Sequence, residues 1–192
     1  MRIIAGTKKG MNLLSPKTFV SRPIIDRVKE SLFSVLYKYD LPERAIVADL
    51  FCGVGSLGLE ALSRGAEFVT FVDKDVDIVN ILKKNIAKAG FNSESKVIKG
   101  SAFNIELKIA SEGQKCDLVF VDPPYAKSKN TQPGSPLADL LGSLNGKVKD
   151  KGIVVVRTSG EVVLLDNYGN LKVIERRKWG TMAVTIFRSK LS

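Results

Sequence analysis

The segment Val121-Asp122-Pro123-Pro124-Tyr125 follows an apolar run and combines three groups that can hold a flat polar molecule. The prolines fix the backbone and leave carbonyl oxygens with no adjacent N–H to pair, while a carboxylate only accepts hydrogen bonds. Tyr125 can stack on a ring, which is worth about 1–3 kcal/mol for a nucleobase. This combination suits a base with an exocyclic amine, whose hydrogens Asp122 and a proline carbonyl would accept. Asp122, Pro123, Pro124 and Tyr125 are therefore the candidate catalytic residues, and an ordinary Pro-Pro turn with an acidic cap is the alternative.

A glycine-rich turn lies upstream of this segment. Residues 53–58, Gly-Val-Gly-Ser-Leu-Gly, match G-x-G-x-x-G between an apolar strand-like run and a helix-like run, and Asp73 ends the next apolar run about 20 residues later. Such glycines let the backbone approach a nucleotide-type cofactor, and Asp73 can accept both ribose hydroxyls. A fortuitous match in a glycine-rich loop is the alternative.

The charges around this turn favour one class of cofactor over another. A dinucleotide would place its pyrophosphate at the helix N-terminus, where nearby carboxylates repel it. Four acids are expected at the same edge of the sheet: Asp49, Asp73, Asp75 and Asp122. This ring of acids suits the sulfonium and ammonium of S-adenosylmethionine better than the phosphates of NAD.

The composition narrows the possible chemistry and partners. The chain has 192 residues, no histidine and only two cysteines far apart in sequence, so we expect no imidazole catalysis, metal site or disulfide framework. It carries 30 Lys and Arg against 20 Asp and Glu, and the net charge of +10 points to an anionic partner such as nucleic acid. The first nine residues lack a signal-peptide core and no apolar run reaches the roughly 20 residues of a membrane span. We therefore expect a cytoplasmic protein without a membrane partner.

The excess positive charge lies at the two ends of the chain. Residues 1–40 and residues 171–192 each have a net charge of +5, while residues 41–170 hold 16 charges of each sign. We interpret the ends as basic arms that hold a polyanion by its phosphates, although lysines on an ordinary solvated surface are the alternative. The candidate RNA-binding residues are Lys8, Lys9, Arg22, Arg27, Arg176, Arg177 and Lys178.

The hydrophobic pattern predicts the elements that position these groups. Residues 3–14 read as a hairpin and residues 24–38 as a helix closed by Pro42. Five apolar runs then alternate with helical stretches, which predicts a doubly wound parallel sheet. In the helical stretch between the second and third runs, Asp75 is the expected N-terminal cap and Gly90 the expected end. Two antiparallel strands near 171–178 and 182–188 would close its edge. We expect one domain over residues 1–192, with a basic hairpin and helix at 1–40 and a catalytic core at 41–192.

Several motifs in order resemble a known family. The start Arg2-Ile-Ile-Ala-Gly, the stretch from Arg22 to Phe33, the stretch from Asp49 to Ala66 and the Asp-Pro-Pro-Tyr sequence are similar to the bacterial small-subunit (16S) ribosomal RNA guanine-N2 methyltransferase family. The resemblance covers most of the chain and implies a Rossmann-like, seven-stranded class I methyltransferase sheet using S-adenosylmethionine. It also implies methylation of the exocyclic N2 of one guanine in 16S ribosomal RNA, within a small ribosomal subunit or its assembly intermediate, by a monomer.

The resemblance assigns roles to residues and reveals departures. The residues expected to contact the cofactor are Asp49, Cys52, Gly53, Gly55, Asp73, Lys74, Ser101 and Ala102. Asp73 stands where a glutamate is expected, which shortens the reach to the ribose, and Ser101 stands where relatives carry Asp or Asn, so a hydroxyl or backbone carbonyl would meet the adenine amine. Ile24 replaces the threonine that usually follows Arg22-Pro23, which weakens the assignment of Arg22 as an RNA contact or a cofactor-side contact.

Three rival functions remain open from the sequence. A DNA or RNA adenine-N6 methyltransferase could use the same Asp-Pro-Pro-Tyr sequence, but a DNA enzyme predicts a large recognition insert, and only the short stretch 127–136 is available for one. A dinucleotide-dependent dehydrogenase conflicts with the ring of acids. A non-catalytic RNA-binding module would bind RNA without transferring a methyl group.

Overall fold

A single mixed sheet organises the protein in the computed structural model, which describes residues 1–16, 24–104, 108–111 and 113–190. The strand order is β3-β2-β1-β4-β5-β8-β7-β6. The parallel strands are β1 (Ile46–Leu50), β2 (Phe68–Asp73), β3 (Ser95–Lys99), β4 (Cys116–Val121) and β5 (Val148–Ser159). The antiparallel strands are β6 (Asn167–Tyr168), β7 (Leu171–Trp179) and β8 (Met182–Ser189).

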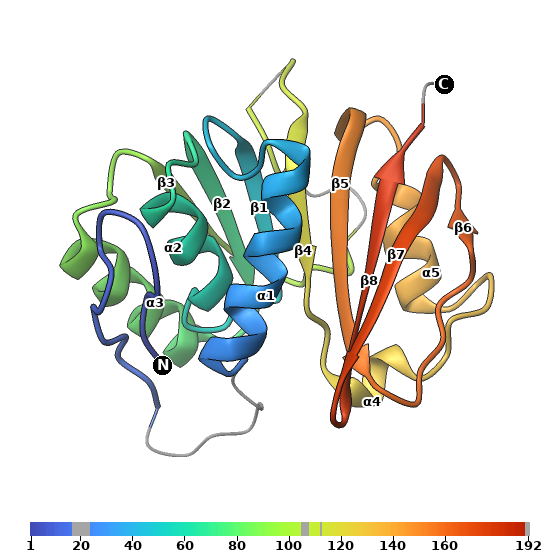
Figure 1. Ribbon diagram of the computed structural model, residues 1–192, viewed down its shortest axis with the longest axis horizontal. Coiled ribbons are helices and arrows are strands. Elements are labelled where there is room, and N and C mark those ends of the chain that lie inside the picture. The colour runs from blue at the N-terminus through green and yellow to red at the C-terminus, as the bar shows by residue number, and fades with distance from the viewer. Residues whose placement is uncertain (17–23, 105–107, 112, 191–192) are drawn as a thin grey trace.

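Helices cover both faces of this sheet, so the protein has three layers (Figure 1). One face carries α1 (Asp26–Leu36), the 3-10 turn η1 (Tyr37–Tyr39), α2 (Ser56–Ser63) and α3 (Val76–Ala89). The other carries α4 (Tyr125–Ser128) and α5 (Pro136–Ser143). The buried apolar residues form two clusters, one under each helical layer, and the central strand β1 is buried along its whole length. This is the arrangement that apolar parallel strands require.

The sequence predicted most of these elements to within a few residues. The Asp75 carboxylate caps α3 by accepting hydrogen bonds from the backbone N–H groups of Asp77 and Ile78, and α3 ends at Gly90 with φ of 75°. The doubly wound fold is confirmed. The expected seven strands become eight, because Asn167 and Tyr168 form a two-residue strand that pairs with β7.

The predicted N-terminal hairpin has less regular structure than expected. Its two arms meet in one isolated bridge between Arg2 and Asn12, and the Ile3 N–H donates to the Met11 carbonyl at 2.9 Å. Ile3 is fully buried, so this loop is packed against the body of the protein although it forms no strand.

A buried ionic cluster, which the sequence analysis did not predict, anchors this loop. The Glu60 carboxylate of α2 is inaccessible and lies 3.2 Å from the Lys29 ammonium of α1 and 2.8 Å from the Arg64 guanidinium. It also accepts hydrogen bonds from the backbone N–H groups of Ile4 and Ala5. Burial lowers the pKa of Lys29, while Glu60 opposes this shift. The cluster therefore ties the N-terminal loop, α1 and α2 into one unit.

Candidate functional site

The strand order reverses between β1 and β4, and this is the place where open α/β sheets bind ligands. The chain runs outward from β1 to β3 and returns in β4, on the other side of β1. The Asp122 N–H donates to the Leu50 carbonyl at 3.2 Å, and the Cys52 N–H donates to the Val72 carbonyl at 3.1 Å. These bonds bring the glycine turn and the Asp-Pro-Pro-Tyr corner (Asp122–Tyr125) to one edge of the sheet.

The glycines of the turn are required by its backbone shape. Gly53 and Gly55 have φ of 55° and 89°, in the left-handed region that favours glycine. A Cβ on Gly53 would meet nothing within 4 Å, so this residue leaves open space, whereas a Cβ on Gly55 would lie 2.5 Å from a methyl of Leu82. A Cβ on Gly58 would lie 2.3 Å from the ring of Phe71. The first glycine thus leaves room for a ligand, and the last lets α2 pack closely on the sheet.

Asp49 is the penultimate residue of β1 and is 1% exposed. Its carboxylate accepts a hydrogen bond from the Gly58 N–H at 2.9 Å. Burial is the main cause that raises its pKa from 3.8 to about 8, and the charges of Asp122 and Asp73 add to the rise. The deprotonated form is therefore costly unless a cation comes near.

Asp73 supports the glycine turn directly. Its carboxylate accepts hydrogen bonds from the Gly53 N–H at 2.9 Å and from the Asp75 N–H at 3.0 Å. A carboxylate has about four acceptor positions, so capacity remains for a ribose hydroxyl. Asp75, in contrast, is exposed and uses its carboxylate to cap α3.

The remaining predicted cofactor residues flank these acids. Lys74 is exposed, and Cys52 is buried with a pKa that burial raises well above its ordinary value, so this thiol is inert. After β3, the exposed Ser101 accepts a hydrogen bond from the Phe103 N–H at 3.3 Å, and Ala102 is buried.

Beside them, the rings of Phe103 and Phe51 meet edge to face with centroids 4.8 Å apart. Sequence reasoning missed this aromatic pair. Its signal was a phenylalanine next to each predicted cofactor segment.

The Asp-Pro-Pro-Tyr corner leads into the short helix α4. The Pro124 carbonyl accepts a hydrogen bond from the Lys127 N–H at 2.8 Å, so it serves the helix. The hypothesis that a proline carbonyl accepts an amine hydrogen of the base therefore points to the carbonyl of Pro123. Tyr125 is half-buried at the start of α4.

Arg157, which the sequence analysis overlooked, pairs with Asp122. Its Nε and Nη2 donate to the two Asp122 carboxylate oxygens at 2.6 and 2.5 Å. Burial raises the pKa of Asp122, and the guanidinium opposes the rise. The sequence signal was an arginine at the end of the apolar run 152–156, but only the β4–β5 register, with Val121 opposite Val156, places it beside Asp122.

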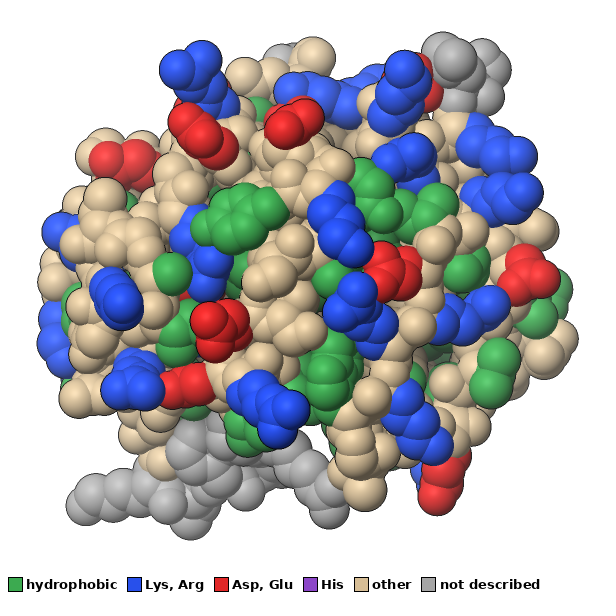
Figure 2. Space-filling model, viewed as in Figure 1, with side chains coloured by type: hydrophobic (Ala, Val, Ile, Leu, Met, Phe, Trp, Pro, Cys, Tyr) green, Lys and Arg blue, Asp and Glu red, His purple; other side chains and the backbone are tan. Residues whose placement is uncertain are grey.

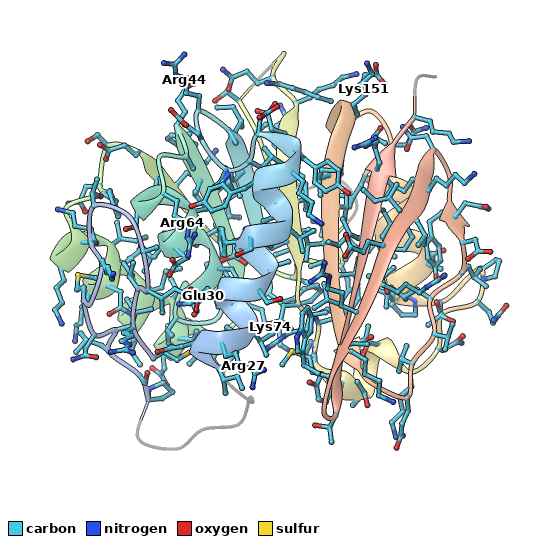
Figure 3. All side chains as sticks on the ribbon, viewed as in Figure 1. Arg27, Glu30, Arg44, Arg64, Lys74 and Lys151 are labelled. Atoms are coloured by element: carbon cyan, nitrogen blue, oxygen red, sulfur yellow. The ribbon has the colours of Figure 1, made fainter. Side chains whose placement is uncertain are left out.

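The candidate RNA-binding residues divide into separate groups. Figure 3 shows Arg27 and Lys74 near the same end of the molecule, with Arg44 and Lys151 at the opposite end. Because Lys74 follows β2, the end that carries Arg27 is the one where the glycine turn and the corner lie. Lys and Arg side chains spread over the whole face that carries α1 (Figure 2).

The β7–β8 hairpin also reaches this edge, since its Met182 pairs with Ser159 at the end of β5. Lys178 is exposed there. Arg176 donates to the Leu164 carbonyl and to Asp166, and Arg177 donates to the Glu175 carboxylate.

Lys8 and Lys9 lie elsewhere. The Lys8 N–H donates to the Ser63 hydroxyl at the end of α2, and its ammonium lies 5.7 Å from the centre of the Phe91 ring, just beyond α3. Both helices begin at the edge that carries the corner, so these lysines lie near the opposite edge. Arg22 is outside the described residues.

The side chains at this edge fit a cationic nucleoside. In a dinucleotide site the first amides of the helix receive a phosphate, but here the Gly58 amide at the start of α2 donates to the Asp49 carboxylate. Asp49 and Asp73 would face the positive groups and ribose of such a ligand, and Ala102 with the Phe51–Phe103 pair would offer an apolar surface to a base.

The fold and this edge together define a class I methyltransferase. A solved structure described as "Putative methyltransferase yhhF from Escherichia coli" superposes with a TM-score of 0.81 at 29% identity and covers 100% of this chain and 99% of that one. The family model described as Conserved hypothetical protein 95 matches residues 1–188.

The curated relatives include proteins named Ribosomal RNA small subunit methyltransferase D. The Haemophilus influenzae protein is 37% identical over 90% of this chain and 86% of its own length, and the Escherichia coli K12 protein is 31% identical over 98% and 89%. The chain belongs to this methyltransferase D family. Among the described residues, no helix combines the length and apolar character needed to cross a bilayer.

Proposed function

We propose that this protein transfers a methyl group from S-adenosylmethionine to the exocyclic N2 of a guanine in small-subunit ribosomal RNA. One observation carries the proposal: Asp49 and Asp73, two acids that suit a cationic ligand, lie at the same edge of the sheet as the Asp-Pro-Pro-Tyr corner. The names of the relatives and the basic ends of the chain support an RNA substrate.

The corner would prepare the amine for attack. S-adenosylmethionine supplies an electrophilic methyl group on a sulfonium when it is bound. Asp122 and the Pro123 carbonyl would accept the two amine hydrogens, which turns the nitrogen lone pair toward that methyl group, and Tyr125 would hold the base by stacking. Because burial raises the pKa of Asp122, its carboxylate takes up the released proton more readily than an ordinary aspartate does.

The target guanine must be unpaired or flipped, because N2 lies on the edge that pairs in a duplex. Exposed cations at the same edge, Arg27 and Lys178, would hold the neighbouring phosphates. Removal of one such cation should weaken binding similarly for all RNA sequences. It should also reduce the slope of log binding constant against log salt concentration by about one. Lys178→Ala should show this effect, while Lys9→Ala, at the other edge, should bind RNA nearly as the parent protein does.

The test combines transfer with mapping. The protein is incubated with labelled S-adenosylmethionine and small subunits from a strain that lacks the modification, and the labelled nucleotide is mapped. Asp122→Ala should abolish transfer while calorimetry still detects cofactor binding, and the exposed Asp150→Ala is the matched control. Labelling of an adenine, or binding of RNA with no transfer by the parent protein, would refute the proposal.

A further inference from the structure

Arg157 is held in an unusual place for a cation. It ends the apolar part of β5 and is 9% exposed, among the least accessible charged side chains described. Its Nη1 lies 3.8 Å from the Met182 sulfur at the start of β8, and its two other donor nitrogens both point at Asp122. The guanidinium therefore links three neighbouring strands at the reactive end of the site.

We propose that Arg157 is a positioning residue that keeps Asp122 ionised and fixes the orientation of its carboxylate toward the substrate amine. The inference rests on the proposed function of Asp122 as the amine acceptor. A carboxylate has about four acceptor positions, and Arg157 uses one on each Asp122 oxygen, so about two positions remain for a substrate. The Asp122 side chain is 20% exposed, so part of the carboxylate can still meet a substrate.

The chemistry explains why such a partner is needed. A protonated carboxyl donates through one oxygen and so cannot accept an amine hydrogen there. Burial favours this protonated form of Asp122. Among the described residues, the other titratable groups near the pair are Asp49 of β1, whose own pKa burial raises, and Tyr125 at the start of α4, while Met182 from β8 is uncharged. Arg157 is the cation that opposes this protonation.

Ionisation of Asp122 can be measured without any methyl transfer. In protein labelled with ¹³C at the aspartate carboxyl carbon, the Asp122 signal is assigned by its loss in D122N and followed against pH. We expect the midpoint to rise by about one pH unit or more in R157Q, a tenfold change in proton affinity, and to stay near the parent value in R157K. An unchanged midpoint in R157Q would overturn the inference.

Kinetics then separate positioning from simple folding. R157Q should shift the acid limb of the pH profile of kcat to higher pH, in step with the NMR midpoint of Asp122. R157K, which keeps the charge but removes the paired donors, should lower kcat with little change in KM. The matched control is R44Q, because Arg44 is exposed at the opposite end (Figure 3).

The outcomes distinguish the two proposals. If the parent protein transfers no methyl group yet the NMR midpoint moves in R157Q, the proposed function fails and the role of Arg157 in ionisation stands. If R157Q lowers kcat by the same factor at every pH and leaves the NMR midpoint of Asp122 unchanged, Arg157 is only structural. If R157Q does not fold, R157K decides: a raised KM with unchanged kcat would overturn the inference.

Discussion

Replacing Asp49 with asparagine should stabilise the protein while it weakens cofactor binding. Burial raises the pKa of Asp49 from 3.8 to about 8, so between these pH values the folded protein holds a proton that the unfolded chain has released. The contribution of Asp49 to the free energy of unfolding therefore falls as pH rises, by up to about 1.4 kcal/mol per pH unit. Asparagine keeps an oxygen that can accept from the Gly58 N–H but has no such proton. Relative to the parent protein, the free energy of unfolding of the variant should be nearly unchanged at pH 4 and higher by on the order of 4 kcal/mol at pH 7.

Urea unfolding at successive pH values measures this difference. The stability gap between Asp49→Asn and the parent protein should widen from pH 5 to pH 8 and stop widening above it. The exposed Asp150→Asn is the control. Calorimetry at pH 8 should show weaker binding of S-adenosylmethionine to Asp49→Asn, and proton release on binding to the parent protein. A stability gap that is the same at every pH would refute the assignment of a buried, protonated Asp49.

Three further substitutions or treatments test other parts of the structure. Gly55→Ala should cost about 1–3 kcal/mol in urea unfolding, because φ is 89° and the new Cβ would lie 2.5 Å from a leucine methyl; an unchanged stability would mean that the turn adapts freely. Glu60→Gln should cost about 3–5 kcal/mol, since it leaves the buried Lys29 without its counter-ion, and a loss below about 1 kcal/mol would contradict the buried cluster. Cys52 and Cys116 should resist iodoacetamide at pH 8 until the protein unfolds, because burial raises the pKa of Cys116 to about 12 and that of Cys52 well above its ordinary value; rapid labelling of the folded protein would contradict this.

Local pattern was enough to predict the strands and most helices. Short runs rich in β-forming residues that alternate with helical stretches predict the parallel strands, and Asp75 and Gly90 mark the ends of α3 through their own side-chain and backbone preferences. The strand β6 was missed because two residues carry no periodicity. Its position depends on the pairing of Tyr168 with Leu171, a tertiary contact.

The candidate site was predictable wherever one segment holds the chemistry. The glycine turn and the Asp-Pro-Pro-Tyr corner are each contiguous, and the rule that parallel strands end at one edge brings them together. Arg157 and Asp122 are 35 residues apart, and their pairing follows from the register of β4 and β5, which no local pattern specifies. For the same reason the net charge of residues 1–40 could not show that Lys8 and Arg27 lie at opposite edges of the sheet.

Depth in the structure explains how one edge could take two ligands of opposite charge. The acids suited to a cationic cofactor are buried or half-buried under the glycine turn, where Asp49 is 1% exposed, whereas Arg27 and Lys178 are exposed at the surface. Charges in water attract a polyanion over roughly 8–10 Å at physiological salt and are screened beyond that, while buried charges act mainly on groups that enter the site. RNA would therefore meet the cations first, and only the flipped base would reach the acids. Under the proposed function, Arg157 would keep Asp122 able to accept from such a base, because its guanidinium donates to both Asp122 carboxylate oxygens.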